Sequence, residues 1–168
     1  MRQVTIFLDY RLDEQEITEI WKHISKLSWW QSMTIEDFKQ SVKSSICNVA
    51  TVFEDNKNKI IGYIRVFTDY CQLCYYDDLV INPEYRGLKA GKALMAAVRA
   101  NENTKYARRH LLLAGHGVSE LHKSLGFNEI KDNKHYIAMD DIYESNKAQD
   151  YLDSLSHIVI DDGGCNGF

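Results

Sequence analysis

The segment from Asn82 to Leu94, NPEYRGLKAGKAL, contains the residue types that can bind a phosphate group. Gly87 and Gly91 lie where an apolar, strand-like run gives way to an alanine- and leucine-rich run. A strand that turns tightly into a helix exposes the first N–H groups of that helix, and together with the helix dipole they attract anions. Positive charge surrounds this turn, from Arg86, Lys89 and Lys92. The segment is either a phosphate site or a plain connecting loop, because loops with two glycines are common.

Cys71 and Cys74 are the one closely spaced pair of cysteines, and two such thiols could bind a metal ion. A zinc site needs a second pair of ligands at matching spacing, which the sequence lacks. Positions i and i+3 of a strand also point to opposite faces of its sheet. We therefore expect two ordinary half-buried thiols and no metal site.

Helices and strands must position these residues, and hydrophobic periodicity predicts where they lie. Apolar residues at i, i+3, i+4 and i+7 from Ile17 predict a helix over 17–27. Thr34 can cap a second helix, with Asp37 three residues later. Two strand-like runs joined by a polar turn predict a β-hairpin. Strands are predicted at 4–8, 48–54, 60–68, 73–81, 110–114 and 135–139, and further helices at 89–100 and 118–125.

The order of these elements predicts a single α/β domain around a mixed sheet. We place this domain at 1–141 and expect a polar C-terminal tail at 142–168. The tail can form a short helix over 144–155 and an edge strand over 157–160.

Composition limits the partners and the location of the chain. Its 168 residues fit one domain, and 45% hydrophobic with 26% charged residues is ordinary for a globular protein. The net charge of −4 gives no support for nucleic-acid binding and favours cationic small molecules or basic peptides. The start of the chain does not resemble a signal peptide, and no apolar run is long enough to span a membrane. We expect a cytoplasmic protein without a nucleic-acid or membrane partner.

The longer segment LVINPEYRGLKAGKAL resembles the acetyl-CoA signature of the GNAT superfamily of N-acetyltransferases, an R/Q-x-x-G-x-G/A loop between a strand and a helix. Arg86 and Gly91 match its first and last positions, whereas Lys89 replaces the middle glycine. The downstream sequence SELHKSLGF resembles the xxLYxxxGF helix of the family. The order of elements resembles that of the family over about residues 4–140. The spacing of the motifs is similar to that in small bacterial N-acetyltransferases.

This resemblance implies acetyl-CoA as the cofactor, CoA as a product, and a mostly antiparallel sheet whose strands splay at the cofactor site. A backbone N–H of Leu79 or Val80 would meet the thioester carbonyl. Backbone groups of the loop would hold the pyrophosphate, and the Lys89 ammonium could add a phosphate contact. The cofactor-binding residues implied in this way are Leu79, Val80, Ile81, Arg86, Gly87, Leu88, Lys89, Ala90, Gly91 and Lys92.

The resemblance also implies catalytic roles. In the family, an acidic residue on the strand before the loop often serves as a base, which makes Asp77 the first candidate and Asp78 the second. Adjacent strand residues face opposite ways unless a bulge intervenes, so we expect one of the two to line the site. The alternative is a pair of strand-edge carboxylates. His122 stands where the family usually has the tyrosine that protonates the thiolate, and its alternative is a partly exposed helix histidine.

Aromatic residues near the first two helices could form the wall of an acceptor site, namely Trp29, Trp30 and Tyr76, with the hydrophobic core as the alternative location. We expect an N-acetyltransferase that transfers acetyl directly to a primary amine of a small molecule in a ternary complex. The alternatives are an acyl-CoA-binding module without turnover, or an acetyltransferase of protein amines or charged tRNA. A homodimer is left open.

Overall fold

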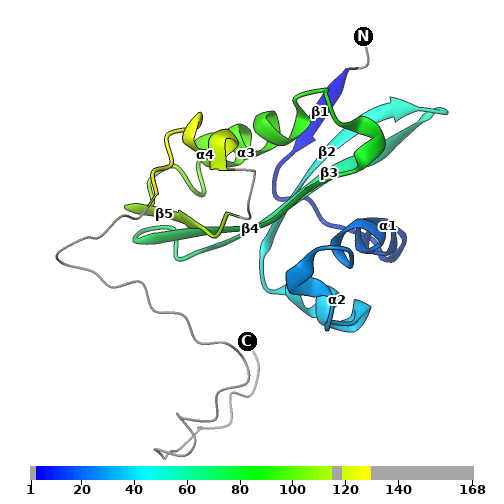
Figure 1. Ribbon diagram of the computed structural model, residues 1–168, viewed down its shortest axis with the longest axis horizontal. Coiled ribbons are helices and arrows are strands. Elements are labelled where there is room, and N and C mark those ends of the chain that lie inside the picture. Colours follow the sequence, from blue (N-terminus) through cyan, green and yellow to red (C-terminus); the bar gives the residue numbers. More distant parts are fainter. Residues whose placement is uncertain (1–2, 115–118, 130–168) are drawn as a thin grey trace, which may run out of the picture. The chain divides into compact units, whose positions relative to one another are not determined.

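The computed structural model of the protein describes residues 3–114 and 119–129. Within these residues, five strands form one open mixed sheet in the order β1-β2-β3-β4-β5 (Figure 1). The first four strands pair in an antiparallel manner, and β5 runs parallel to β4, in agreement with the expected fold class. The strands are β1 (Val4–Phe7), β2 (Ile46–Glu54), β3 (Lys57–Thr68), β4 (Leu73–Ile81) and β5 (Arg109–Leu112).

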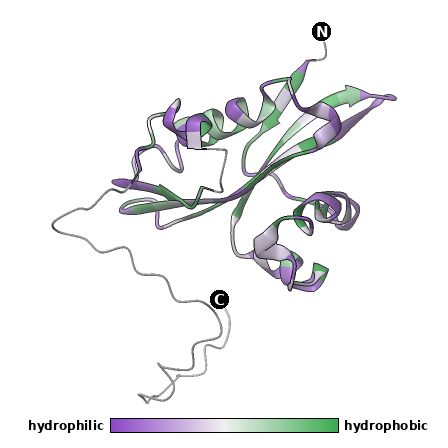
Figure 2. Cartoon of the chain, in the orientation of Figure 1, coloured by the Kyte–Doolittle hydropathy of each residue, from purple (hydrophilic) through white to green (hydrophobic). Residues whose placement is uncertain are grey.

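Helices cover both faces of this sheet. The described helices are α1 (Glu14–Ile24), α2 (Ile35–Lys43), α3 (Ala90–Ala100) and α4 (Ser119–Lys123), and 3₁₀ turns span Ser28–Trp30 and Pro83–Tyr85. The helices α1 and α2 lie on one face, whereas α3 lies on the other (Figure 1). Hydrophobic residues concentrate in the strands between these layers (Figure 2). No helix in the described ranges is both long and apolar enough to cross a membrane.

Capping residues set the start of the first two helices. Thr34 accepts a hydrogen bond from the Asp37 N–H and forms a capping box with it, as predicted. Asp13 and Glu16 form the same motif at α1, which therefore begins before the predicted residue 17. The hairpin turn is shorter than predicted, because β3 begins at Lys57.

The predicted strand 135–139, the tail elements at 144–155 and 157–160, and the domain boundary after residue 141 all lie outside the described residues.

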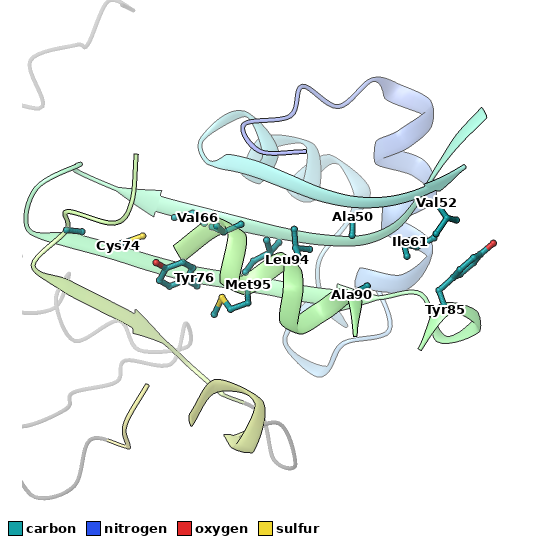
Figure 3. Packing of buried hydrophobic residues seen from close by; sticks show 13 residues of the cluster. Ala50, Val52, Ile61, Val66, Cys74, Tyr76, Tyr85, Ala90, Leu94 and Met95 are labelled. Carbon is teal, nitrogen blue, oxygen red and sulfur yellow. The ribbon is translucent and has the colours of Figure 1, made fainter. Parts of the chain in front are cut away.

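Two hydrophobic clusters hold the layers together. Between the sheet and α3, Leu94 and Met95 pack against strand residues that include Val66 and Tyr76 (Figure 3). On the other face, Phe38 of α2 contacts the rings of Trp30 and Tyr63, with centroid distances of 5.6 and 5.7 Å. This second cluster fixes the segment between α1 and α2, which carries both adjacent tryptophans.

We expect Phe38→Ala to lower the free energy of unfolding by about 3–5 kcal/mol, because Phe38 is completely buried and its removal leaves a cavity. The matched control is Phe53→Ala, since Phe53 is 69% exposed and its loss should change stability by about 0.5 kcal/mol or less. Urea unfolding followed by circular dichroism measures both values. An equal effect of the two substitutions would contradict this description of the core.

Candidate active site

The strands β4 and β5 part from one another in the middle of β4. Their parallel pairing runs from Leu73 with Arg109 to Tyr76 with Leu112 and then ends. Beyond that point β4 continues to Ile81, paired on its other side with β3. Within the described residues, this part of β4 has a free edge that faces away from β3. The expected splay of the strands is therefore present.

Backbone N–H groups of β4 are available along this free edge. The Asn82 N–H donates to the Ile61 carbonyl in β3, at 2.8 Å. Because successive N–H groups of a strand point to opposite edges, the N–H groups of Ile81 and Leu79 point away from β3. Of the two residues expected to meet a thioester carbonyl, Leu79 thus has the suitable direction and Val80 does not.

A β-bulge in β4 brings two adjacent carboxylates to the same side. The register between β3 and β4 shifts between Tyr63 and Arg65, and Asp78 has a positive φ of 54°. As a consequence, Asp77 and Asp78 both reach Arg65 in β3. This bulge is the exception named for the expectation that only one of them lines the site, and both residues border the same cavity.

Arg65 joins the two carboxylates below the surface. Its Nε lies 2.5 Å from Asp78 Oδ2, and one terminal nitrogen lies 2.8 Å from Asp77 Oδ2. The guanidinium group also lies over the Phe67 ring, at 4.9 Å from its centroid. Both Arg65 and Asp78 are buried. The alternative of two ordinary strand-edge carboxylates is therefore wrong.

Two indole groups complete the surroundings of Asp78. Its Oδ1 accepts hydrogen bonds from Trp30 Nε1 at 2.7 Å and from Trp29 Nε1 at 3.0 Å. Trp30 is buried in the cluster below α1 and α2, so its expected place in the wall of the acceptor site is wrong. Trp29 is 54% exposed and borders the cavity.

The surroundings of Asp77 change its acidity. Burial raises its pKa above the ordinary value of 3.8, and the neighbouring Asp78 raises it further. The guanidinium of Arg65 acts in the opposite direction but does not cancel these effects. A higher pKa makes Asp77 a stronger base than an exposed aspartate.

His122 lies in the wall of the same cavity. It is only 8% exposed, and its ring meets Phe127 edge to face at 6.0 Å. Its Nδ1 has no hydrogen-bond partner among the described residues. Burial lowers the pKa of His122 below 6.5, so the ring is neutral near pH 7. The alternative of a partly exposed helix histidine is wrong.

The cavity between these residues has a volume of about 400 Å³. Its lining includes Met95 of α3, on one face of the sheet, and Trp29 of the segment between α1 and α2, on the other face. Both residues reach the cavity where β4 and β5 part. Tyr76 borders it but is almost fully buried, and its hydroxyl group is bound to His110 Nδ1 at 2.7 Å. Tyr76 is therefore mainly a core residue. The lining residues are Trp29, Ile64, Tyr75, Tyr76, Asp77, Asp78, Leu79, Met95, Leu112, Leu113, Ala114, Leu121 and His122.

The predicted phosphate loop leads from the end of β4 into α3. Gly87 has a φ of 87°, and Lys89, the N-cap of α3, has a φ of 59°. No side chain caps α3, and its first turn has no acidic residue. The starts of α1 and α2 have both a capping box and acidic residues. The first N–H groups of α3 are thus left for an anion.

Close packing brings this loop against the end of β4. A Cβ atom at Gly91 would lie 3.2 Å from Ile81 Cγ1, so glycine permits the short distance between α3 and the strand. The side chains of Arg86, Lys89 and Lys92 are exposed around the turn. Leu88 packs against the core, and Ala90 is buried within it.

Arg65 is the important residue that the sequence analysis missed. It interrupts the apolar run IIGYIRVF, where a charged side chain in a buried strand needs a partner of opposite charge. That signal was available in the sequence. The identity of its partners depends on the bulge at Asp78, which the sequence does not reveal.

Comparisons with known proteins concern the family and the fold of the chain. A family model described as an acetyltransferase (GNAT) domain matches residues 47–129. The solved structure of a GNAT-family acetyltransferase from Xanthomonas campestris pv. campestris is 24% identical in sequence. The match covers 86% of this chain and 99% of the Xanthomonas protein, with a TM-score of 0.68. Residues 47–129 of the chain belong to the GNAT superfamily.

Two other N-acetyltransferases are similar to the chain in sequence or in fold. An uncharacterized N-acetyltransferase from Gracilaria tenuistipitata var. liui is 28% identical over 99 residues. The match covers 58% of this chain and 54% of that protein, so the chain spans about half the length of this relative. An aminoglycoside N-acetyltransferase solved with CoA is 15% identical, with a TM-score of 0.57, covering 84% of this chain and 96% of that one. The chain carries the acyltransferase domain of this superfamily.

We expect Lys89→Gly to leave the free energy of unfolding unchanged or to raise it by up to about 1 kcal/mol, because glycine has no steric penalty at a φ of 59°. The matched control is Lys92→Gly in the first turn of α3, which should cost about 0.5–1 kcal/mol through the lower helix propensity of glycine. Urea unfolding measures both. Equal losses in the two variants would contradict the left-handed conformation of Lys89.

We expect His122→Gln to make the protein less sensitive to acid. The folded-state pKa of His122 lies below the unfolded value of 6.5, so the unfolded chain takes up this proton first and the wild type loses stability as the pH falls below that value. Glutamine removes this contribution. Free energies of unfolding at about pH 7.5 and about pH 5.5 measure the effect. An unchanged pH-dependent loss in the variant would be evidence against a buried, neutral His122.

Proposed function

We propose that the protein is an acetyl-CoA-dependent N-acetyltransferase that transfers acetyl to a primary amine of a small molecule, by direct transfer in a ternary complex. The observation that supports this most strongly is the convergence of Leu79, Asp77 and His122 on one cavity at the parting of β4 and β5. Family membership supports the use of an acyl-CoA, and the acetyl group and the small amine are our proposal.

The residues present suit a CoA molecule. The uncapped start of α3 and the exposed basic side chains of Arg86, Lys89 and Lys92 can hold the phosphate groups. The free edge of β4 offers the N–H groups of Leu79 and Ile81 to the pantetheine arm, and Val80 belongs to the same strand segment. Bound acetyl-CoA would supply the acetyl group as a thioester.

Each remaining part of the reaction has a suitable group. The Leu79 N–H can donate a hydrogen bond to the acetyl oxygen while negative charge develops there. Asp77 takes a proton from the amine, directly or through water, as the new C–N bond forms. As the C–S bond breaks, the ring N–H of His122 would donate a proton to the leaving sulfur, so that CoA leaves as the thiol and His122 regains a proton from water. In this proposal Asp77 accepts the proton of the amine, and His122 acts on the leaving sulfur.

We expect Asp77→Ala to lower kcat/KM by about 10²-fold and His122→Phe to lower it by about tenfold or more, since each removes a proton-handling group. Release of free thiol from acetyl-CoA with a panel of amines measures turnover. Thermal shifts with CoA provide the control, because both variants should still bind it.

Two outcomes would contradict the proposal. Unchanged turnover in both variants would refute the residue assignments. Binding of CoA without thiol release for any small amine would instead indicate a binding module, or an acceptor such as a protein amine or a charged tRNA. The cytoplasmic location and the homodimer remain predictions from the sequence.

A further inference from the structure

The Asp78 carboxylate is bound by three donors of the protein itself. Its Oδ1 accepts both indole N–H groups, and its Oδ2 accepts the Nε–H of Arg65. Its side chain is completely buried. A buried carboxylate with these bonds has a structural role, because its loss would leave three donors without their acceptor. Of the two adjacent carboxylates, Asp77 alone is left to meet a ligand.

Trp29 is held in place by the Asp78 carboxylate. Its indole ring is 54% exposed, yet its Nε1 donates to the buried Asp78 at 3.0 Å. The ring borders the cavity and is exposed, so it lies at the open side where an acceptor would enter. An exposed tryptophan fixed at the mouth of a cavity can bind an ammonium group on its ring face.

The charges around the cavity favour one ammonium group. Asp77 and Asp78 carry two negative charges and Arg65 carries one positive charge, which leaves one negative charge on Asp77 to be balanced. His122 faces them from α4 and is neutral near pH 7. Apolar and aromatic side chains make up most of the remaining lining, including Tyr75, Leu112, Leu113 and Ala114. Among the described lining residues, a second ammonium group would lose water without gaining a partner.

We infer that the acceptor is a primary monoamine with an apolar body, that its ammonium group binds between Asp77 and the Trp29 ring, and that Asp78 is the positioning residue that fixes this ring. This inference rests on the proposed function. The ammonium group first loses one proton to solvent by way of Asp77, and Asp77, ionised again, takes the second proton as the nitrogen attacks the thioester and the C–N bond forms. Asp78 therefore contributes through Trp29 and Arg65, without direct contact with the substrate.

The test compares n-hexylamine with 1,6-diaminohexane, which share a chain and differ in the second amino group. Calorimetry measures the binding of each to the CoA-loaded protein, and thiol release from acetyl-CoA measures the KM and kcat of each. We expect n-hexylamine to bind at least tenfold more tightly and to have the lower KM. Equal or tighter binding of the diamine would overturn the proposed substrate class.

Variants test the roles of Trp29 and Asp78. We expect Trp29→Ala to raise the KM for n-hexylamine about tenfold without changing the KM for acetyl-CoA. Trp29→Phe keeps a ring but loses the N–H that bonds to Asp78, so it should raise the same KM by a smaller factor. Phe53→Ala is the matched control, because Phe53 is an exposed aromatic residue outside the cavity lining. An unchanged KM in Trp29→Ala would overturn the role of the ring.

A double-variant comparison isolates the positioning role. If Asp78 acts by fixing Trp29, Asp78→Asn should raise the KM in the wild-type background but add little in the Trp29→Phe background. The kcat of Asp78→Asn should depend on pH as the kcat of the wild type does, whereas Asp77→Ala should lose this dependence. Fully additive effects, or loss of that pH dependence in Asp78→Asn, would overturn the assignment. Should Asp78→Asn fail to fold, the two Trp29 variants still decide whether the ring binds the amine.

Failure of this inference can be distinguished from failure of the proposed function. Thiol release that favours the diamine would refute the inference and retain the acetyltransferase. Binding of n-hexylamine that depends on Trp29, without thiol release, would retain the binding site and refute the proposed reaction.

Discussion

The contact of Arg65 with Asp77 and Asp78 is the interaction on which the site depends. A buried guanidinium group without any carboxylate partner would leave a charge without compensation, at a cost of about 3–5 kcal/mol. This requirement holds the bulge of β4 in register with β3 and fixes both indole groups on Asp78. One buried cation thereby connects the centre of the sheet to the loop between α1 and α2.

The remaining parts of the site depend on the pairing of the two edges of β4 and on its connection to α3. One edge of the strand pairs with β3, and the other is free after Tyr76 because β5 parts from it. The end of β4 then leads into α3, whose start lacks the caps that α1 and α2 have. The free edge, the two carboxylates and the anion-binding turn are thus consecutive features of a single strand and its connection, which explains why the relevant residues lie close together in the sequence.

Much of the fold could be predicted from local patterns, whereas the assembled site could not. The capping box of Thr34, the hairpin, and the bounds of β4 follow from periodicity and turn chemistry that act over a few residues. The turn from β4 into α3, to which we assign the phosphate groups, could be located for the same reason. The bulge at Asp78 was not, because it depends on a buried partner that is distant in the sequence. The separation of Trp29 from Trp30, one exposed and one in the core, depends on the packing of Phe38 and shows no local pattern.

The most direct test of the central claim is a titration of the protein with CoA, followed by the backbone amide signals in two-dimensional NMR. Binding along the free edge of β4 and at the start of α3 should shift the amide signals of Leu79, Ile81 and the residues from Gly87 to Lys92. The amide signals of α1 should remain where they are. An absence of shifts at saturating CoA, or shifts confined to α1 and the hairpin turn, would contradict the assignment of this cavity as the site of an acyl-CoA.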